Sequence, residues 1–444
     1  MFAKHLTRLF VFKFLGIFAS SHNKQHSGVL EEPPTRNSKS WPQNRNEAQT
    51  SNTDHQFEYA KYHGSKSIVN LMLVNGIPGV TVGVAIRGKT VWSSAFGFCD
   101  VENHLECNPD ARMRVASISK PIFVATVLAP MIEANTLDIS SSVHKYLSRD
   151  EFPKQKYEGK EYDITIEQLL THTSGINHYG GGSQQLSPIG STGSQQIYQC
   201  SQQYTRTGFY QRHTYRNVID ALVPFKDGPL DAKPGTKFNY TTYGWTLLSA
   251  VAEKVHQQTA PADAKGRKEQ IEDYWMKVLR RDWGLNEISL DQDEPILSNR
   301  ARYYIRSPPG GDLINAPYVD NSIKWAGGGL SSTVKDLTKF GTALIDSYKG
   351  RPGAKLKRDT VELLWKERMS NYCFGFYSRT LDPGESGGEK RAIYHTGGAT
   401  GASSVLIIYP ESEIVVAILA NLSWVNPANV GFMIADAFAK ELVS

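Results

Sequence analysis

Strand-like sequence occurs near both ends of this chain, whereas the long stretch between them favours helices and loops. Residues 80–86 and 90–96 read as two short strands around an Arg-Gly-Lys turn, as in a β-hairpin. Runs typical of strands return late in the chain, at residues 372–379, 392–395, 403–409 and 414–420, and helical patterns cover residues 57–75 and 426–442. We therefore predict an α+β fold. Both ends of the chain would complete one mainly antiparallel sheet flanked by helices, with a mostly helical subdomain inserted between them.

Composition divides the chain into a leader, a linker and a folded domain. Residues 1–25 are basic and apolar, contain no acidic residue, and have Lys13 inside the hydrophobic run. This composition favours a mitochondrial presequence, with a secretory signal as the alternative. Residues 26–56 are rich in Pro, Asn, Ser, Gln and charge, which indicates a disordered linker. The folded domain is residues 57–444, with an α/β part over about 57–130 and 320–444 and a helical part over about 131–319. Within it, residues 177–215 read as an extended loop and residues 256–271 as a second insertion.

Charge, cysteines and hydropathy exclude several classes of protein. Part of the net charge of +5 lies in the basic leader, so the folded domain is near neutral and charge implies no nucleic-acid partner. The four cysteines show neither a CxxC pair nor zinc spacing. Cys99 and Cys107 could meet across a turn, but free thiols are the default expectation. With no metal-ligand cluster and no dinucleotide fingerprint, we expect no cofactor, and with no uncharged apolar run of sufficient length we predict no integral membrane span.

The first candidate for chemistry is Ser117-Ile-Ser-Lys120, at the start of an apolar run over 117–134 that predicts a buried helix. Residues three apart on a helix share a face, so Ser117 and Lys120 would lie together. A serine hydroxyl becomes nucleophilic when a base takes its proton, and a buried lysine can be that base because burial lowers its pKa. The alternative is a capping serine with a lysine in solvent, which the apolar helix argues against.

Two further segments could complete a site. Tyr240 follows a Pro-Gly turn and precedes an apolar helix, where a phenol beside a lysine can transfer a proton; the alternative is a tyrosine of the core. His395-Thr396-Gly397-Gly398 ends one predicted strand, and glycine there lets a substrate backbone approach the strand. The N–H groups of Gly398 and Ser117 could then form an oxyanion hole.

In this order the three segments resemble the S-x-x-K, Y-x-N and [KH]-[TS]-G pattern of the penicillin-recognising serine hydrolases. That family includes class C β-lactamases, D-Ala-D-Ala carboxypeptidases and related esterases. Residues 169–176 (LLTHTSGI) resemble its LLxHTSG segment, and residues 326–337 resemble its AGG-xxSTxxDL segment. The resemblance covers about residues 60–440. Within the family, residues 117–120 and 321–329 (NSIKWAGGG) are most similar to the mitochondrial serine β-lactamase-like branch of animals.

The resemblance implies a β-lactamase/transpeptidase-like fold and assigns roles to the site. Ser117 would be the nucleophile and Lys120 its base, while Tyr240 would protonate the leaving group and later activate water. His172 would be buried, hydrogen-bonded and structural.

On the substrate side, His395 would stand where many relatives have lysine, and Thr396, Gly397 and Gly398 would border the substrate. Thr242 would also lie on the substrate side, but it departs from the family pattern, because relatives have an asparagine there that binds a substrate amide and the lysine. Hydrolysis of β-lactams is therefore in doubt.

We weigh three functions. The first is a mitochondrial peptidase or amidase that acts on a peptide or small acyl substrate through an acyl-serine. The resemblance places such a peptidase in the intermembrane space, forming filaments and influencing lipid metabolism. The second is an esterase or β-lactamase on the same scaffold. The third is a mainly structural protein that forms homo-oligomers or filaments.

Overall fold

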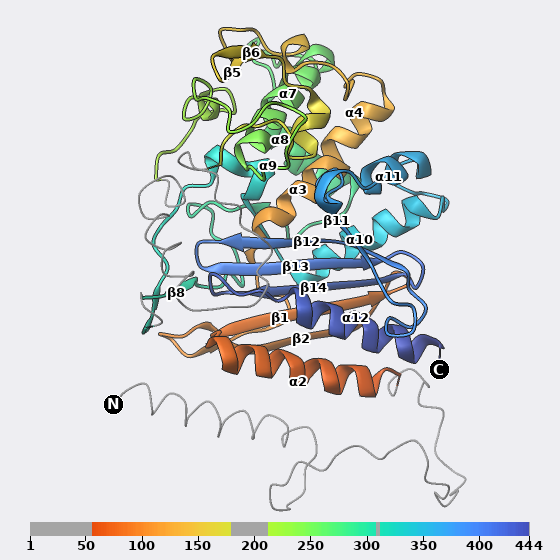
Figure 1. Ribbon diagram of the computed structural model, residues 1–444. Coiled ribbons are helices and arrows are strands. Elements are labelled where there is room, and N and C mark those ends of the chain that lie inside the picture. Colours follow the sequence, from red (N-terminus) through yellow and green to blue (C-terminus); the bar gives the residue numbers. More distant parts are fainter. Residues whose placement is uncertain (1–55, 179–211, 308–310, 444) are drawn as a thin grey trace, which may run out of the picture. The chain divides into compact units, whose positions relative to one another are not determined.

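The computed structural model describes residues 56–178, 212–307 and 311–443 (Figure 1). The chain divides into two compact units, residues 1–59 and residues 60–444, and the sheet and the candidate site belong to the second. The predicted leader, most of the predicted linker and most of the loop expected over residues 177–215 lie outside the described residues. The division of the folded domain into α/β and helical parts stays a prediction.

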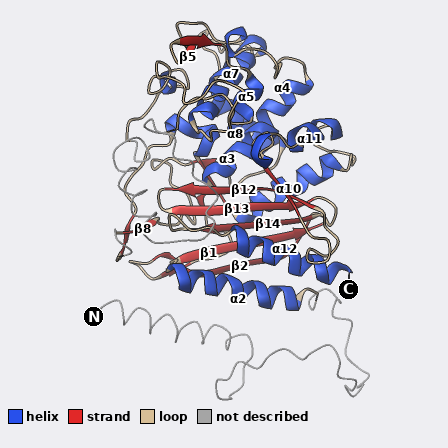
Figure 2. Ribbon diagram, viewed as in Figure 1, coloured by secondary structure: helices blue, strands red, loops and turns tan. Residues whose placement is uncertain are grey.

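The central feature is a seven-stranded sheet that both ends of the chain build together, as the sequence predicted (Figure 2). Every neighbouring pair is antiparallel. In spatial order the strands are β11 (Tyr377–Thr380), β12 (Arg391–Ala399), β13 (Ala402–Tyr409), β14 (Ile414–Ala420), β1 (Gly79–Ile86), β2 (Lys89–Asp100) and β3 (Leu105–Glu106).

Helices cover both faces of this sheet, which explains why every residue of the three central strands β13, β14 and β1 is buried. Gly341 of α10 (Val334–Tyr348) lies against Ile408 and Val415. Gly431 of α12 (Ala428–Val443) lies against Ile407. Since Ile407 and Ile408 are neighbours on one strand, their side chains point to opposite faces, and so the two helices lie on opposite sides.

The remaining elements lie mostly between the two strand-forming ends of the chain. The other helices are α2 (Glu58–Asn75), α3 (Ser119–Phe123), α4 (Ala129–Glu133), α5 (Ile166–Leu170), α7 (Tyr243–Thr259), α8 (Ile271–Lys277), α9 (Trp325–Gly328) and α11 (Arg358–Trp365). There are also short 3-10 helices at Ala116–Ile118, Val143–Lys145, Asp220–Leu222, Ser322–Lys324 and Met369–Asn371. Two short π-helical segments are Val124–Leu128 and Val278–Asp282. The minor strands are β4 (Met113–Arg114), β5 (Gln155–Tyr157), β6 (Lys160–Tyr162), β7 (Ser289–Leu290), β8 (Tyr304–Arg306), β9 (Leu313–Asn315) and β10 (Leu330–Ser332).

The structure corrects three expectations. Cys99 and Cys107 form a disulfide, because a β-bulge in β2 and the turn to β3 bring the two residues together, with their Cα atoms 4.7 Å apart. Free thiols were therefore the wrong expectation for this pair, whereas Cys373 is a buried free thiol. The predicted strand over 372–379 begins only at Tyr377, and the insertion predicted over 256–271 begins later, since α7 continues to Thr259.

The apolar run after Ser117 is helical, as predicted, from Ala116 to Glu133. Among the described residues this is the one helix whose length and composition would suffice to cross a membrane. The protein's own core buries 78% of it, which is what a central helix of a folded domain shows.

Candidate active site

The backbone before Ser117 is held on several sides. Ser404 of β13 donates a hydrogen bond from its hydroxyl to the carbonyl of Val115 (2.8 Å), and the Val115 N–H donates to Leu330 (2.9 Å). Ala116 has a φ of +49°, a left-handed conformation that costs free energy in a residue with a side chain. These two hydrogen bonds hold Val115, the residue next to Ala116, at the point where the helix of Ser117 begins.

Ser117, Lys120 and Tyr240 meet at one point, as their sequence segments predicted. Lys120 Nζ lies 3.0 Å from Ser117 Oγ, one helical turn away. The Tyr240 hydroxyl donates to the same oxygen at 2.9 Å. Lys120 Nζ also lies 4.8 Å from the centre of the Tyr240 ring. The serine hydroxyl therefore has a nitrogen base on one side and a phenol on the other.

The environment of Lys120 favours its neutral form. Its side chain is completely buried, and burial, followed by the charge of Lys324, lowers the pKa of Lys120 well below its usual 10.5. Lys324 is also buried, and burial lowers its own pKa to about 8. A neutral Lys120 has a lone pair that can take the proton of Ser117 Oγ.

Gly327 lies beside Thr242 and provides a hydrogen-bond acceptor for Lys120. Lys120 Nζ donates to the carbonyl oxygen of Gly327, so a backbone group accepts the second hydrogen bond of the lysine. A Cβ atom on Gly327 would lie 2.5 Å from the Thr242 methyl group. Thr242 is buried against Gly327 and therefore packs the segment that holds Lys120, whereas the predicted role was contact with the substrate.

His172 fixes the loop that carries Tyr240. The N–H groups of Asn239 and Thr241, on either side of Tyr240, donate to the His172 carbonyl (2.7 Å) and to His172 Nδ1 (3.1 Å). The His172 and Tyr240 rings pack with their centres 4.2 Å apart. The predicted structural role of His172 agrees with this arrangement.

Three further residues surround these groups, and none of them was predicted as a site residue from the sequence: Gly327, Lys324 and His178. His178 accepts a hydrogen bond from the Thr242 N–H at 3.2 Å, and its ring meets that of Tyr240 edge to face. Gly327 and Lys324 lie in residues 321–329 (NSIKWAGGG), which indicated the family but not a role for either residue. The hydrogen bond of Gly327 with Lys120 and the effect of the Lys324 charge on it depend on long-range packing, which no local pattern reveals.

His395, Thr396, Gly397 and Gly398 belong to β12, whose end packs beside Ser117. β11 pairs with β12 only over Arg391–Tyr394, so among the described strands none covers the following residues on that edge. His395 is buried behind this edge, whereas Thr396 is half-buried and Gly398 is exposed. The structure thus brings the segment to the site, with His395 in a less accessible position than a substrate-bordering residue would have.

The two glycines differ in the space around them, which gives a matched pair of variants. A Cβ on Gly397 would lie 2.1 Å from Ser404 Oγ and 2.4 Å from the Val115 carbonyl, whereas a Cβ on Gly398 would meet nothing within 4 Å. We expect Gly397→Ala to destabilise the fold by about 3 kcal/mol through overpacking, while Gly398→Ala leaves stability nearly unchanged. Thermal unfolding of the two variants measures this difference. Equal melting temperatures would contradict the packing of β12 against the Ser117 segment.

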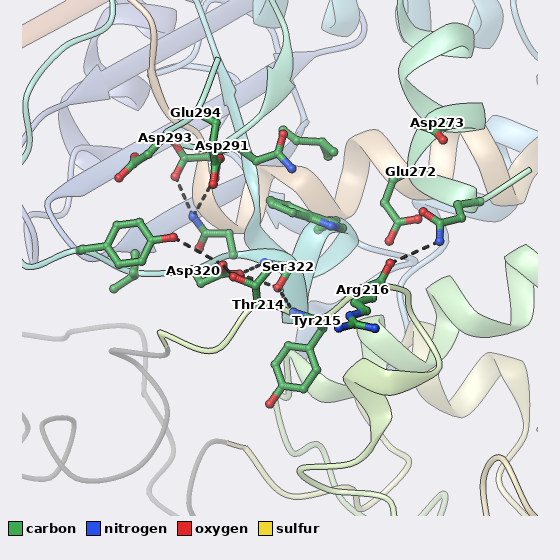
Figure 3. Close-up of a pocket in the computed structure, with 17 residues that line it drawn as sticks. Thr214, Tyr215, Arg216, Glu272, Asp273, Asp291, Asp293, Glu294, Asp320 and Ser322 are labelled. Atoms are coloured by element: carbon green, nitrogen blue, oxygen red, sulfur yellow. Dashed lines mark hydrogen bonds between the residues drawn. The ribbon is translucent and has the colours of Figure 1, made fainter. Parts of the chain in front are cut away.

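Figure 3 shows a pocket of about 230 Å³ beside the segment that leads to Gly327. Six carboxylates line it: Glu272, Asp273, Asp291, Asp293, Glu294 and Asp320. Asp291 bonds the buried Arg114 (2.6 Å) and Asn321 (2.7 Å), and Asp320 accepts from the Ser322 N–H (2.8 Å). These bonds fix the segment that carries Lys324 and Gly327.

Comparison with known proteins agrees with the fold. The model of the family described as "Beta-lactamase" matches residues 66–429. The chain is 33% identical to the human "Serine beta-lactamase-like protein LACTB, mitochondrial" over 82% of this chain and 77% of that protein, and 32% identical to the bovine protein over the same shares.

Two solved structures share the fold at low identity. One is the octameric penicillin-binding protein homologue from Pyrococcus abyssi, with a TM-score of 0.62, 22% identity, and coverage of 84% of this chain and 76% of that one. The other is the hydrolase EstCE1, with a TM-score of 0.64, 19% identity, and coverage of 86% and 100%. With its family match, its relatives and its fold in agreement, the chain belongs to the beta-lactamase family.

Proposed function

We propose that this chain is a serine hydrolase that forms an acyl-enzyme on Ser117 and acts as a peptidase or amidase. The observation that carries the proposal is the position of Ser117 Oγ, 3.0 Å from the buried Lys120 Nζ and 2.9 Å from the Tyr240 hydroxyl. A buried lysine next to a serine at a helix start has a clear chemical use, because it can accept a proton at neutral pH.

The proposed acylation proceeds in balanced proton steps. Lys120 takes the proton of Ser117 Oγ as this oxygen bonds the substrate carbonyl carbon. The carbonyl oxygen becomes an oxyanion, which the N–H groups of Ser117 and Gly398 stabilise. Tyr240 gives its proton to the leaving amine, and the Lys120 ammonium returns a proton to Tyr240. In deacylation Tyr240 passes its proton to Lys120 as it takes a proton from the attacking water, and Ser117 Oγ leaves with the proton that Lys120 has just received.

The surroundings of Thr242 support a substrate other than a β-lactam. Relatives with asparagine at this position use it to bind a substrate amide, whereas Thr242 is 5% exposed and packs against Gly327. The amide contact is therefore lost, while the lysine keeps a second partner in the Gly327 carbonyl. An ester substrate is the second candidate, since ester and amide hydrolysis share the acyl-serine step.

A substrate panel tests the proposal on the full chain. The panel comprises short p-nitrophenyl esters, peptide p-nitroanilides and nitrocefin, each measured with the wild type and with Ser117→Ala. We expect turnover of anilides and esters, little turnover of nitrocefin, and a loss of roughly 10³-fold or more in Ser117→Ala. Equal turnover by the Ser117→Ala variant on every substrate would exclude the acyl-serine mechanism.

We also propose a mitochondrial location. The basic, acid-free leader supports it, and the curated relatives in human, mouse and cattle are named as mitochondrial. Residence in the intermembrane space, an influence on lipid metabolism and assembly into homo-oligomers or filaments rest on the family resemblance alone. Fractionation of mitochondria and sedimentation of the purified chain test the location and the assembly.

A further inference from the structure

Two buried histidines and a buried tyrosine form a chain of hydrogen bonds behind the proposed catalytic groups. His172 Nε2 lies 3.1 Å from the Tyr372 hydroxyl, which lies 3.4 Å from Nε2 of His395. His172 holds the Tyr240 loop, and His395 belongs to β12, so the chain links two of the segments that form the site. Tyr372 is completely buried and belongs to none of the family segments.

Two backbone groups fix the direction of every bond in this chain. The Thr241 N–H donates to His172 Nδ1, so that nitrogen has the lone pair and the proton of the neutral ring is on Nε2. At the other end, His395 Nδ1 lies 2.6 Å from the Thr396 carbonyl oxygen, which can only accept, so the proton of His395 is on Nδ1. It follows that His172 donates to the Tyr372 hydroxyl, and that this hydroxyl donates to His395 Nε2.

The three hydrogen-bonded side chains are neutral near pH 7, so each keeps the donor or acceptor role described above. Burial, followed by the charge of Lys120, lowers the pKa of His395 to about 3 and that of His172 well below 6.5. Burial raises the pKa of Tyr372 well above 10. The Trp245 Nε1–H also points at His172 Nε2, at 3.4 Å, but a neutral ring has one nitrogen lone pair. The shorter approach of the Thr241 N–H, at 3.1 Å, assigns that lone pair to Nδ1.

We propose that Tyr372 is a positioning residue: its hydroxyl bridges His172 and His395, whose tautomers the two backbone groups set, and so fixes the Tyr240 loop and the end of β12 around Ser117. Without the Tyr372 hydroxyl, the Nε2–H of His172 and the Nε2 lone pair of His395 lose the partner that they share. The Tyr240 loop and β12 then lose the bridge between them, beside the strand edge that no described strand covers. The catalytic consequence rests on the proposed acyl-serine function, whereas the tautomers do not.

Nuclear magnetic resonance tests the tautomers without any substrate. In the full chain labelled with ¹⁵N-histidine, two-bond correlations of the rings distinguish Nδ1–H from Nε2–H. We expect the Nε2–H pattern for His172 and the Nδ1–H pattern for His395, with assignments from His172→Gln and His395→Asn. In Tyr372→Phe both tautomers should stay, whereas the Nε2 signal of His395 should shift because this nitrogen loses its hydrogen-bond donor. A wild-type His395 in the Nε2–H form, or one unchanged by Tyr372→Phe, would overturn the proposal.

Turnover tests the catalytic consequence. We expect Tyr372→Phe to lower kcat roughly tenfold through misplacement of the Tyr240 loop and β12, with KM within about twofold. Tyr377→Phe is the matched control, because its ring packs 5.4 Å from that of His395 but its hydroxyl is not a link in the chain. In a His395→Asn background, Tyr372→Phe should have almost no further effect, because both changes break the same link.

The two measurements separate the failure of this proposal from the failure of the proposed function. Melting temperatures first show that each variant is folded. Multiplicative losses in the double variant, or a change in KM alone, would overturn a positioning role for Tyr372. A wild type with the expected tautomers and no acyl-transfer activity would instead refute the acyl-serine function.

Discussion

Lys120→Met is expected to lower kcat/KM roughly 10³-fold, because it removes the base that takes the proton of Ser117. Methionine keeps much of the volume of the buried side chain, so the helix over 116–133 should stay packed. Steady-state kinetics on the best substrate of the panel measures the loss. A variant with more than a tenth of the wild-type kcat/KM would show that another group takes the serine proton.

The pH profile gives an independent test of the same base. Lys120 is active when neutral, so kcat/KM should rise with pH through its lowered pKa and then level off. The charge of Lys324 helps to lower that pKa, so Lys324→Met should raise the pKa of Lys120 and move the acid limb to higher pH. The wild type and Lys324→Met should be compared below pH 8, because Lys324 has a pKa of about 8 and loses its charge above it. A limb that stays in place or moves to lower pH would contradict the coupling.

Tyr240→Phe is expected to lower kcat on amide substrates about 10²-fold, because the leaving amine loses its proton donor. The loss should be smaller on p-nitrophenyl esters, whose leaving group departs without a proton. The ring keeps its contact with His172, so the fold should be preserved. Tyr243→Phe is the control, since the Tyr243 ring stacks on Phe225 instead. Equal losses on both substrates would assign Tyr240 to serine activation and not to the leaving group.

The parts of the site that depend on local spacing could be predicted from the sequence. Ser117 and Lys120 are one helical turn apart, and Tyr240 and His395 lie in short segments with a recognisable order. Likewise, β-rich apolar runs at both ends of the chain predicted the antiparallel sheet, because central strands that are buried on both faces are apolar over most of their length.

The remaining parts depend on contacts between distant residues. The Gly327 carbonyl is 207 positions from Lys120, and Tyr372 is 200 positions from His172, so no periodic pattern reveals either contact. The Cys99–Cys107 bond was allowed by its spacing, but the pairing of β2 with β3 and the bulge in β2, which no local pattern predicts, bring the two residues together. The buried position of Thr242 could not be read from its segment either, because the Gly327 backbone determines it.

The most direct test of the central claim is the site of covalent modification by a fluorophosphonate probe. After reaction of the full chain, peptide mass spectrometry should find the adduct on Ser117, with no labelling of Ser117→Ala and much slower labelling of Lys120→Met. An adduct on another residue, or equal labelling of the wild type and Ser117→Ala, would contradict the assignment of Ser117 as the nucleophile.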